Sequence, residues 1–210
     1  MADEVILLDS WPSMFGIRVR IALAEKGVEY EFRDEDLVNK TPMLLQMNPI
    51  HKKIPVLIHY YAEVRRGERV VTMVEGQKQE RCPSKRASRL QNSEIEVYNA
   101  GTKIWSLKGE ELETAKKEFI EIMKTLEAEL GDKSYFGGDN FGFVDASLIP
   151  FYCWFYSYET LGNFSIETEC PKIIAWAKRC MQKETVSKSL KDEKKVFEFV
   201  LMLRKRYGVE

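Results

Sequence analysis

The chain has 210 residues, of which 44% are hydrophobic and 31% are charged. Its formal net charge of −1 argues against an electrostatic surface for nucleic acid or an anionic membrane. Its longest apolar run, residues 146–158, is interrupted by Pro150 and falls short of the roughly 18 residues that a membrane-spanning helix needs. We therefore expect neither nucleic acid nor a membrane as a partner.

The first predicted elements are a strand over residues 4–9 and an apolar-periodic helix over 14–24. Ser13 lies between them, and a serine at this place can act in two ways. Its oxygen can cap the helix by accepting a backbone N–H. Alternatively, its proton can be donated to a thiolate or phosphate that the helix N-terminus attracts. Position alone favours the cap.

Three further patterns extend the α/β organisation. Residues 29–33 alternate polar and aromatic side chains, which predicts a half-buried strand. A short helix is expected over 41–47, with Thr41 as its cap and proline at its first position. Residues 54–60 form a third apolar strand, whose beginning suits Pro55. This β-α-β-α-β order predicts a partly parallel sheet.

The remaining pattern is a hairpin followed by helices. Segments 56–64 and 69–74 read as two strands around an Arg66-Gly67 turn. From about residue 83 the periodicity is helical, and Asp145 is placed to bind the free N–H groups at the start of a helix over 146–158. The sequence thus predicts a small α/β domain over residues 1–80 and an all-helical domain over 83–210. Other helices are expected from Pro83 onward and over 110–130, 171–181 and 191–207.

The cysteines indicate reduced thiols in a cytoplasmic protein. No two of them form a CxxC pair, and none has metal-ligand spacing with His51 or His59. We therefore expect no metal site and no dithiol redox centre, so that any reacting thiol would come from a ligand. The four cysteines are Cys82, Cys153, Cys170 and Cys180.

Several motifs occur in combination: Ser10-Trp11-Pro12-Ser13, Asn39-Lys40-Thr41-Pro42, the stretch NPIHKKIPVL at 48–57, Tyr135-Phe136-Gly137-Gly138-Asp139, Phe143-Val144-Asp145, Glu169-Cys170-Pro171 and Trp176. Together they resemble the tau class of plant glutathione transferases. The resemblance implies a thioredoxin-like α/β N-terminal domain and an all-α C-terminal domain. It also implies a cytoplasmic homodimer that conjugates glutathione, a co-substrate rather than a cofactor, to small hydrophobic electrophiles in detoxification or stress.

The resemblance assigns roles to individual residues. Ser13 would be the catalytic hydroxyl that stabilises the thiolate, while Lys40 and Lys53 would contact the glycyl carboxylate of glutathione. The backbone of Ile54, before a cis Pro55, would pair with the cysteinyl amide. Trp11 and Phe15 flank Ser13 and are the expected contacts of the electrophile, in a site that we expect between the domains.

One segment departs from the family pattern. Members carry a Glu-Ser pair that binds the γ-glutamyl end of glutathione, and no such pair occurs between Tyr60 and Asn92. Segment 77–82 has no apolar face, and the stretch is about nine residues short. This predicts weak glutathione binding. It also leaves an alternative function, a non-catalytic carrier of hydrophobic ligands, whereas a glutaredoxin-like exchanger would need cysteine in place of Ser13.

Overall fold

The chain divides into two compact units, Met1–Glu80 and Arg81–Glu210. The structure, a computed structural model, describes residues 4–60, 69–71 and 85–209, and the side chains of 4–60 and 93–209. The domain boundary expected at 80–83 lies outside these ranges. Within them, no helix combines the length and the apolarity that crossing a bilayer requires.

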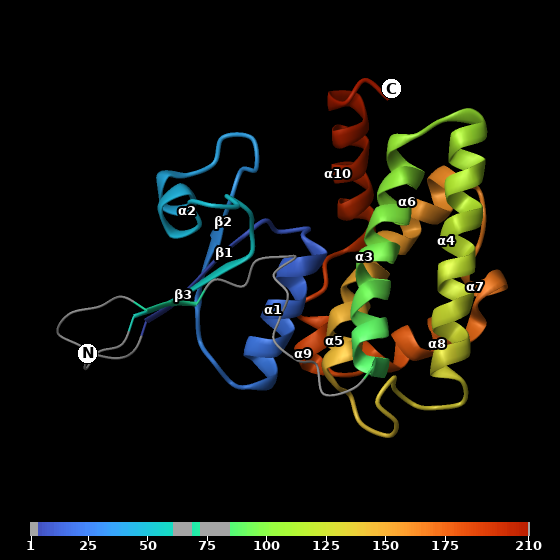
Figure 1. Cartoon of the computed structure of the whole chain (residues 1–210), viewed down its shortest axis with the longest axis horizontal. Coiled ribbons are helices and arrows are strands. Elements are labelled where there is room, and N and C mark those ends of the chain that lie inside the picture. The colour runs from blue at the N-terminus through green and yellow to red at the C-terminus, as the bar shows by residue number, and fades with distance from the viewer. Residues whose placement is uncertain (1–3, 61–68, 72–84, 210) are drawn as a thin grey trace. The chain divides into compact units, whose positions relative to one another are not determined.

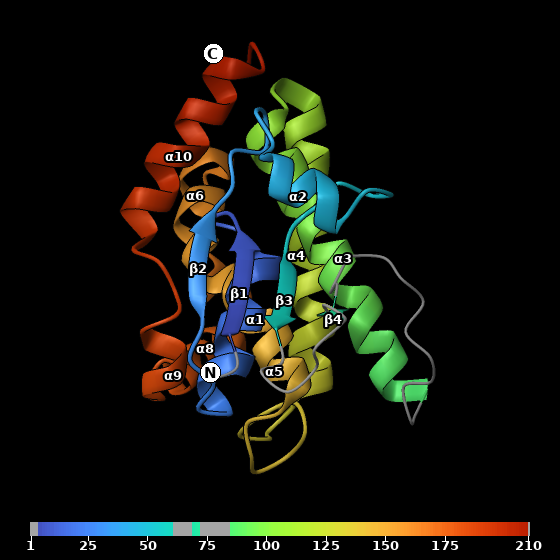
Figure 2. The ribbon, with the colours of Figure 1, turned by 90° about the vertical axis from the view of Figure 1, so that its left-hand side faces the viewer.

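The first unit is built on a four-stranded sheet with the order β2-β1-β3-β4. Strand β1 pairs in parallel with β2 and antiparallel with β3, and β3 pairs antiparallel with β4. Figure 2 shows this arrangement, with β3 running against β1 and β2. The partly parallel sheet and the pairing of the hairpin strands are confirmed, while the Arg66-Gly67 turn lies outside the described residues. The strands are β1 (Glu4–Asp9), β2 (Glu31–Asp34), β3 (Val56–Tyr60) and β4 (Arg69–Val71).

Two helices, α1 (Met14–Glu25) and α2 (Pro42–Met47), cover opposite faces of the sheet. Because successive side chains of a strand point to opposite faces, Ile6 and Leu8 of β1 join a buried cluster with Leu44 of α2. Leu7 points the other way and packs with Leu23 of α1. Burying each such side chain stabilises the fold by about 1.5–3 kcal/mol. The thioredoxin-like N-terminal domain is confirmed.

Two strand predictions need correction. Strand β2 begins at Glu31 rather than 29, and its side chains are mostly exposed instead of half-buried. The reason is its place at the edge of the sheet, where β1 is its only partner among the described strands. Strand β3 begins at Val56 instead of 54, so that the Ile54–Pro55 peptide, which is cis, precedes it.

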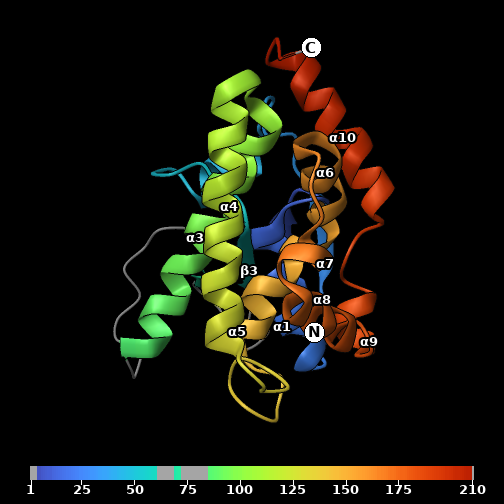
Figure 3. The same cartoon turned by 90° about the vertical axis from the view of Figure 1, so that its right-hand side faces the viewer.

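The second unit contains only helices among its described residues, as expected for the C-terminal domain. Helices α3 and α4 run side by side, and α10 packs along α6 (Figures 1 and 3). The helices are α3 (Lys85–Ser106), α4 (Gly109–Leu130), α5 (Phe143–Leu148), the 3-10 turn η1 (Ile149–Phe151), α6 (Tyr152–Gly162), α7 (Ile166–Glu169), α8 (Pro171–Cys180), α9 (Glu184–Ser187) and α10 (Glu193–Arg206).

The single helix expected over 146–158 is wrong. The structure has α5, the turn η1 and α6 in its place, because Pro150 lacks the N–H that a continuous helix needs. The capping role of Asp145 is confirmed, since its Oδ2 accepts the backbone N–H of Gly142 at 2.9 Å.

Candidate functional site

The loops that carry Ser13, Lys40 and Lys53 lie at one end of the sheet. In the strand registers, Asp9 lies opposite Asp34 and Leu8 lies opposite Val56. The loops that leave β1 and β2 and the loop that enters β3 are therefore at the same end, which Figure 2 shows together with α2. The carboxyl ends of parallel strands are a common place for ligands in α/β folds.

The capping role considered for Ser13 is confirmed. It is the N-cap of α1, and its Oγ accepts the backbone N–H of Gly16 at 3.2 Å. The side chain is half-buried. A hydroxyl that accepts one hydrogen bond still has a proton to donate, and among the described residues no acceptor takes it. The capping role thus leaves a donor at the helix N-terminus.

The turn that carries Ser13 is held by its backbone. The Ser13 N–H donates to the Ser10 carbonyl at 2.9 Å, which closes the turn. The Trp11 N–H donates to Oδ1 of Asp34 at 2.9 Å, and the Trp11 carbonyl accepts from Nη2 of Arg20 at 3.0 Å. Strand β2 and helix α1 therefore fix the turn from two sides.

Arg20 also forms a buried ion pair with Asp9. Its Nη2 lies 2.9 Å from Oδ2 of Asp9, and the two residues are 4% and 0% exposed. Burial raises the pKa of Asp9 to about 7, against the lowering effect of the Arg20 charge. Gly16 makes room for this carboxylate, since a Cβ at position 16 would stand 1.7 Å from Oδ2 of Asp9.

Lys40 precedes a helix start that a buried acid holds in place. Thr41 caps α2 by accepting the Leu44 N–H at 3.1 Å. Its hydroxyl donates to Oε1 of Glu35 at 2.6 Å, and its N–H donates to Oε2 of the same side chain at 3.3 Å. Glu35 is only 4% exposed, so it anchors the segment on which the half-buried Lys40 sits.

A buried amide shapes the loop that carries Lys53. Nδ2 of Asn48 donates to the Lys53 carbonyl at 3.0 Å, and Oδ1 accepts the His51 N–H at 3.3 Å. Lys53 is exposed, and the cis bond that follows Ile54 is the one that the family resemblance implies. Both Ile54 and Pro55 are buried.

Two properties of the predicted contacts bear on ligand binding. Within the described part of the chain, neither Lys40 nor Lys53 forms an ion pair, so both charges are available to an anion. Of the two aromatic candidates, Trp11 is half-buried, whereas Phe15 is 6% exposed and has the Arg18 guanidinium 5.1 Å from its ring centre. The sequence patterns did not predict that Glu35, Asn48 and Arg20 hold these loops in place. The one signal for these was a charged Arg20 on the apolar face of a helix.

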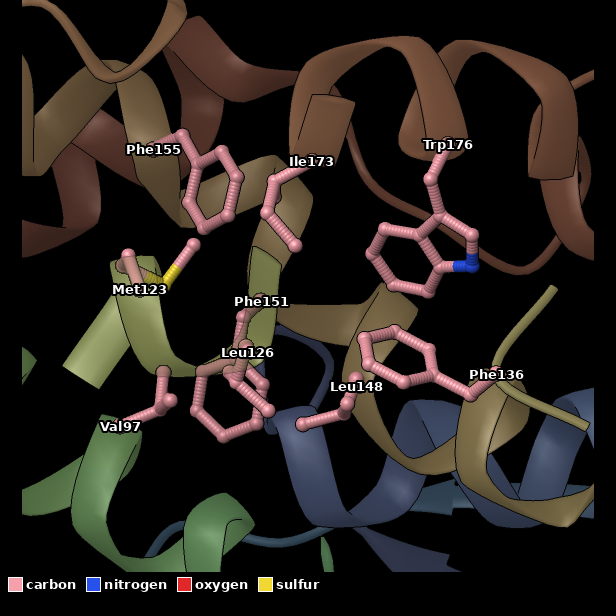
Figure 4. A pocket seen from close by; sticks show the side chains of 9 residues that line it. All are labelled: Val97, Met123, Leu126, Phe136, Leu148, Phe151, Phe155, Ile173 and Trp176. Atoms are coloured by element: carbon pink, nitrogen blue, oxygen red, sulfur yellow. The ribbon is translucent and has the colours of Figure 1, made fainter. Parts of the chain in front are cut away.

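A small void lies in the apolar core of the helical unit. Figure 4 shows nine apolar side chains around it, among them Phe155 and Trp176. The cavity volume is about 10 Å³, which is the size of one water.

Among the described residues, no group of histidine, cysteine or acidic side chains is arranged to hold a metal ion. The described cysteines, all buried and none of them in a disulfide, are Cys153, Cys170 and Cys180.

Comparisons with known proteins identify the family. The models of the glutathione S-transferase N-terminal and C-terminal domains match residues 3–66 and 109–179. Glutathione S-transferase U19 of Arabidopsis thaliana is 57% identical over 219 residues, covering 100% of both chains. Glutathione S-transferase 3 of Glycine max is 50% identical over 214 residues, covering 98% of both. The chain belongs to the glutathione S-transferase family.

Solved structures place this transferase in the tau class. A rice transferase solved in complex with glutathione is 41% identical, with a TM-score of 0.82 and 99% of both chains covered. A tau-class transferase from mango (Mangifera indica) is 26% identical, with a TM-score of 0.78 and 95% and 98% of the chains covered. The predicted family and class are confirmed.

The comparison with the Arabidopsis transferase also bears on chain length. The alignment occupies 219 positions and this chain has 210 residues, so at least nine positions of the alignment have no residue here. This number agrees with the shortfall expected from the sequence. Its location within residues 60–100 stays a prediction.

Proposed function

We propose that this transferase conjugates the thiolate of glutathione to small hydrophobic electrophiles, with the Ser13 hydroxyl stabilising the thiolate. The observation that supports this role is that Ser13 Oγ already accepts the Gly16 N–H, which leaves its proton as the group it can offer. The sulfur would lie at the N-terminus of α1, where the helix dipole favours a negative charge.

The energy required is within the reach of these groups. A free thiol has a pKa of about 8.5, so only a small fraction is ionised at neutral pH. Lowering that pKa by about two units requires ~2.7 kcal/mol of preferential stabilisation of the anion. A hydrogen bond to a charged group contributes about 1.5–3 kcal/mol, and a helix end adds a further 0.3–1 kcal/mol or so.

The remaining proposed contacts orient the tripeptide. Lys40 and Lys53 would bind its glycyl carboxylate, and the Ile54 backbone before Pro55 would pair with its cysteinyl amide. With a chlorodinitrobenzene electrophile, the sulfur forms a bond to the ring carbon and chloride leaves with the bonding pair. The thiol proton passes to solvent. Trp11 and Phe15, on either side of Ser13, are the proposed neighbours of the electrophile. On the family resemblance we also propose a cytoplasmic homodimer.

The test compares Ser13→Ala with the wild type in a conjugation assay. We expect kcat/KM to fall about 10- to 100-fold, the value of one hydrogen bond to a charged group. Because Ser13→Ala also removes a helix cap, Ser165→Ala is the matched control. Ser165 caps α7 by accepting the Thr168 N–H at 3.3 Å, and its loss should leave turnover unchanged. Equal rates for Ser13→Ala and wild type would contradict the role of Ser13.

A second candidate function is a non-catalytic carrier of hydrophobic ligands. The absence of a Glu-Ser pair between Tyr60 and Asn92 favours it, because in the family such a pair holds the γ-glutamyl end of glutathione. Calorimetric titration with glutathione separates the two functions. Micromolar-to-submillimolar affinity together with turnover supports the enzyme and contradicts weak binding. A hydrophobic dye that binds without any turnover supports the carrier.

A further inference from the structure

The ion pair of Asp9 and Arg20 is placed beneath the turn that carries Ser13. Nη2 of Arg20, besides its contact with Asp9, donates to the carbonyl of Trp11 at 3.0 Å and lies 3.4 Å from that of Ser10. These two carbonyls belong to the turn that the Ser13 N–H closes. One buried cation therefore links the end of β1, the turn and helix α1.

Gly16 connects this pair directly to Ser13. Its N–H donates to Ser13 Oγ at 3.2 Å, and its missing side chain leaves the space that the Asp9 carboxylate fills. Any movement of Asp9 towards α1 is blocked by the backbone of the residue that orients the Ser13 hydroxyl. The carboxylate and the hydroxyl thus contact the same residue from two sides.

A gain in stability does not explain why this ion pair is buried. Oδ1 of Asp9 and Nε of Arg20 are buried and have no hydrogen-bond partner among the described residues. A buried pair with unsatisfied atoms has a desolvation penalty that its attraction does not recover, and apolar replacements are often neutral or stabilising. Such arrangements gather at functional sites. Retaining the pair beside Ser13 is therefore better explained by a role in the reaction.

We propose that the Asp9–Arg20 pair is a positioning element for the reaction, which fixes the turn at residues 10–13 and so directs the Ser13 hydroxyl towards the glutathione sulfur. This inference rests on the proposed function. In this role Arg20 acts through the two carbonyls of the turn rather than on the sulfur itself. Loss of Arg20 should therefore weaken the stabilisation of the thiolate more than the binding of the tripeptide.

The experiment measures the pKa of the glutathione thiol bound to the full-length protein, from the ultraviolet absorbance of the thiolate across a pH series. Steady-state kcat and KM are measured with the same proteins. For Arg20→Lys, which keeps the charge but has one ammonium in place of the planar fork, we expect the thiol pKa to rise by about one unit and kcat to fall about tenfold. KM for glutathione should change less than threefold or so.

A second variant keeps the proposal testable if Arg20→Lys does not fold. The double variant Asp9→Asn/Arg20→Met removes both charges and leaves none buried alone, so its stability should approach that of the wild type. We still expect its thiol pKa to be raised, because the carbonyls of Ser10 and Trp11 lose their Arg20 donor. A double variant of normal stability with a wild-type thiol pKa would overturn the proposal and leave the pair a structural role.

Two further variants distinguish a failure of the positioning role from a failure of the proposed function. Arg179→Met is the matched control, since Arg179 donates to the Ser134 carbonyl at 2.6 Å in the helical unit, and its loss should leave the thiol pKa unchanged. Ser13→Ala tests the proposed function in the same assay. If Ser13→Ala raises the thiol pKa and the double variant does not, only the positioning role fails. If Ser13→Ala also has no effect, the proposed role of Ser13 fails.

Discussion

Asp9 in the α/β unit and Asp145 in the helical unit are both 0% exposed, yet their carboxylates meet different partners. Asp145 accepts three N–H groups, from Phe136 at 3.0 Å, Trp176 at 2.8 Å and Gly142 at 2.9 Å. Asp9 has one charged partner, Arg20, and an oxygen without any among the described residues.

The difference teaches what each buried acid does. Asp145 joins the loop before α5, the start of that helix and the side chain of Trp176 in α8, so its bonds are all used to hold the fold together. Asp9 is less well satisfied, and its charge partner is shared with the turn that carries Ser13. We infer that the helical unit uses its buried acid for stability and the α/β unit uses its own for the site.

The largest expected effect is the loss of stability on replacing Asp145. Asp145→Ala leaves two buried donors and one half-buried donor without an acceptor, and each bond to a charged group is worth about 1.5–3 kcal/mol. We expect the free energy of unfolding, measured by urea denaturation, to fall by about 4 kcal/mol or more. Asp139→Ala, at an exposed position in the preceding loop, is the control. A decrease in the free energy of unfolding of less than about 1 kcal/mol would contradict the inference that Asp145 serves stability.

The next effect is the pH dependence that Asp9 contributes to stability. Its pKa is raised from 3.8 to about 7 by burial, so the folded state keeps a proton that the unfolded chain releases above pH 4 or so. This contribution to stability is fully present below 3.8 and is lost as the pH rises through about 7. Relative to Asp9→Asn, the wild type should lose up to about 4 kcal/mol across that window.

Unfolding free energies of both proteins, measured at a series of pH values, check this expectation. Burying the Arg20 charge costs the same free energy at every pH. The two proteins are therefore compared by the slope of the unfolding free energy against pH rather than by its absolute value. A wild type that becomes more stable than Asp9→Asn with rising pH would mean that attraction to Arg20 outweighs the burial of the carboxylate.

Local patterns in the sequence predicted most of the elements. The cap at Ser13, proline at the first position of α2 and the period of α4 are short-range signals, and each element they mark is present. The helix expected over 146–158 was wrong because its apolar character hid the effect of Pro150 on the backbone. The exposed side chains of β2 depend on its edge position, which no local pattern shows.

Local sequence patterns did not predict the residues that hold the site in place. Glu35 reaches Thr41, Asn48 reaches Lys53, and Arg20 reaches Asp9 through side-chain contacts that have no fixed period along the chain. The motifs indicated which residues would contact glutathione but not which residues hold them. Only the placement of Arg20 among apolar neighbours was an unused signal.

The smallest expected effect compares two helix caps. Thr41→Val removes the cap of α2 and the hydroxyl bound to Glu35, whereas Asp192→Ala removes the cap of α10, where Asp192 accepts the N–H groups of Lys194 and Lys195. Loss of a cap costs about 1 kcal/mol, and the lost bond to the Glu35 carboxylate adds about 1.5–3 kcal/mol to the cost of Thr41→Val. Both variants should therefore unfold at lower urea concentrations, and Thr41→Val at the lower of the two.

Only Thr41→Val should change glutathione kinetics, because Lys40 precedes the cap and depends on it for its position. We expect KM for glutathione to rise about threefold to tenfold with kcat little changed, as for a lost contact that binds substrate and transition state equally. Asp192→Ala should leave both constants as they are. A rise in KM of the same size in both variants would mean that general loosening of the fold, rather than the placement of Lys40, controls glutathione binding.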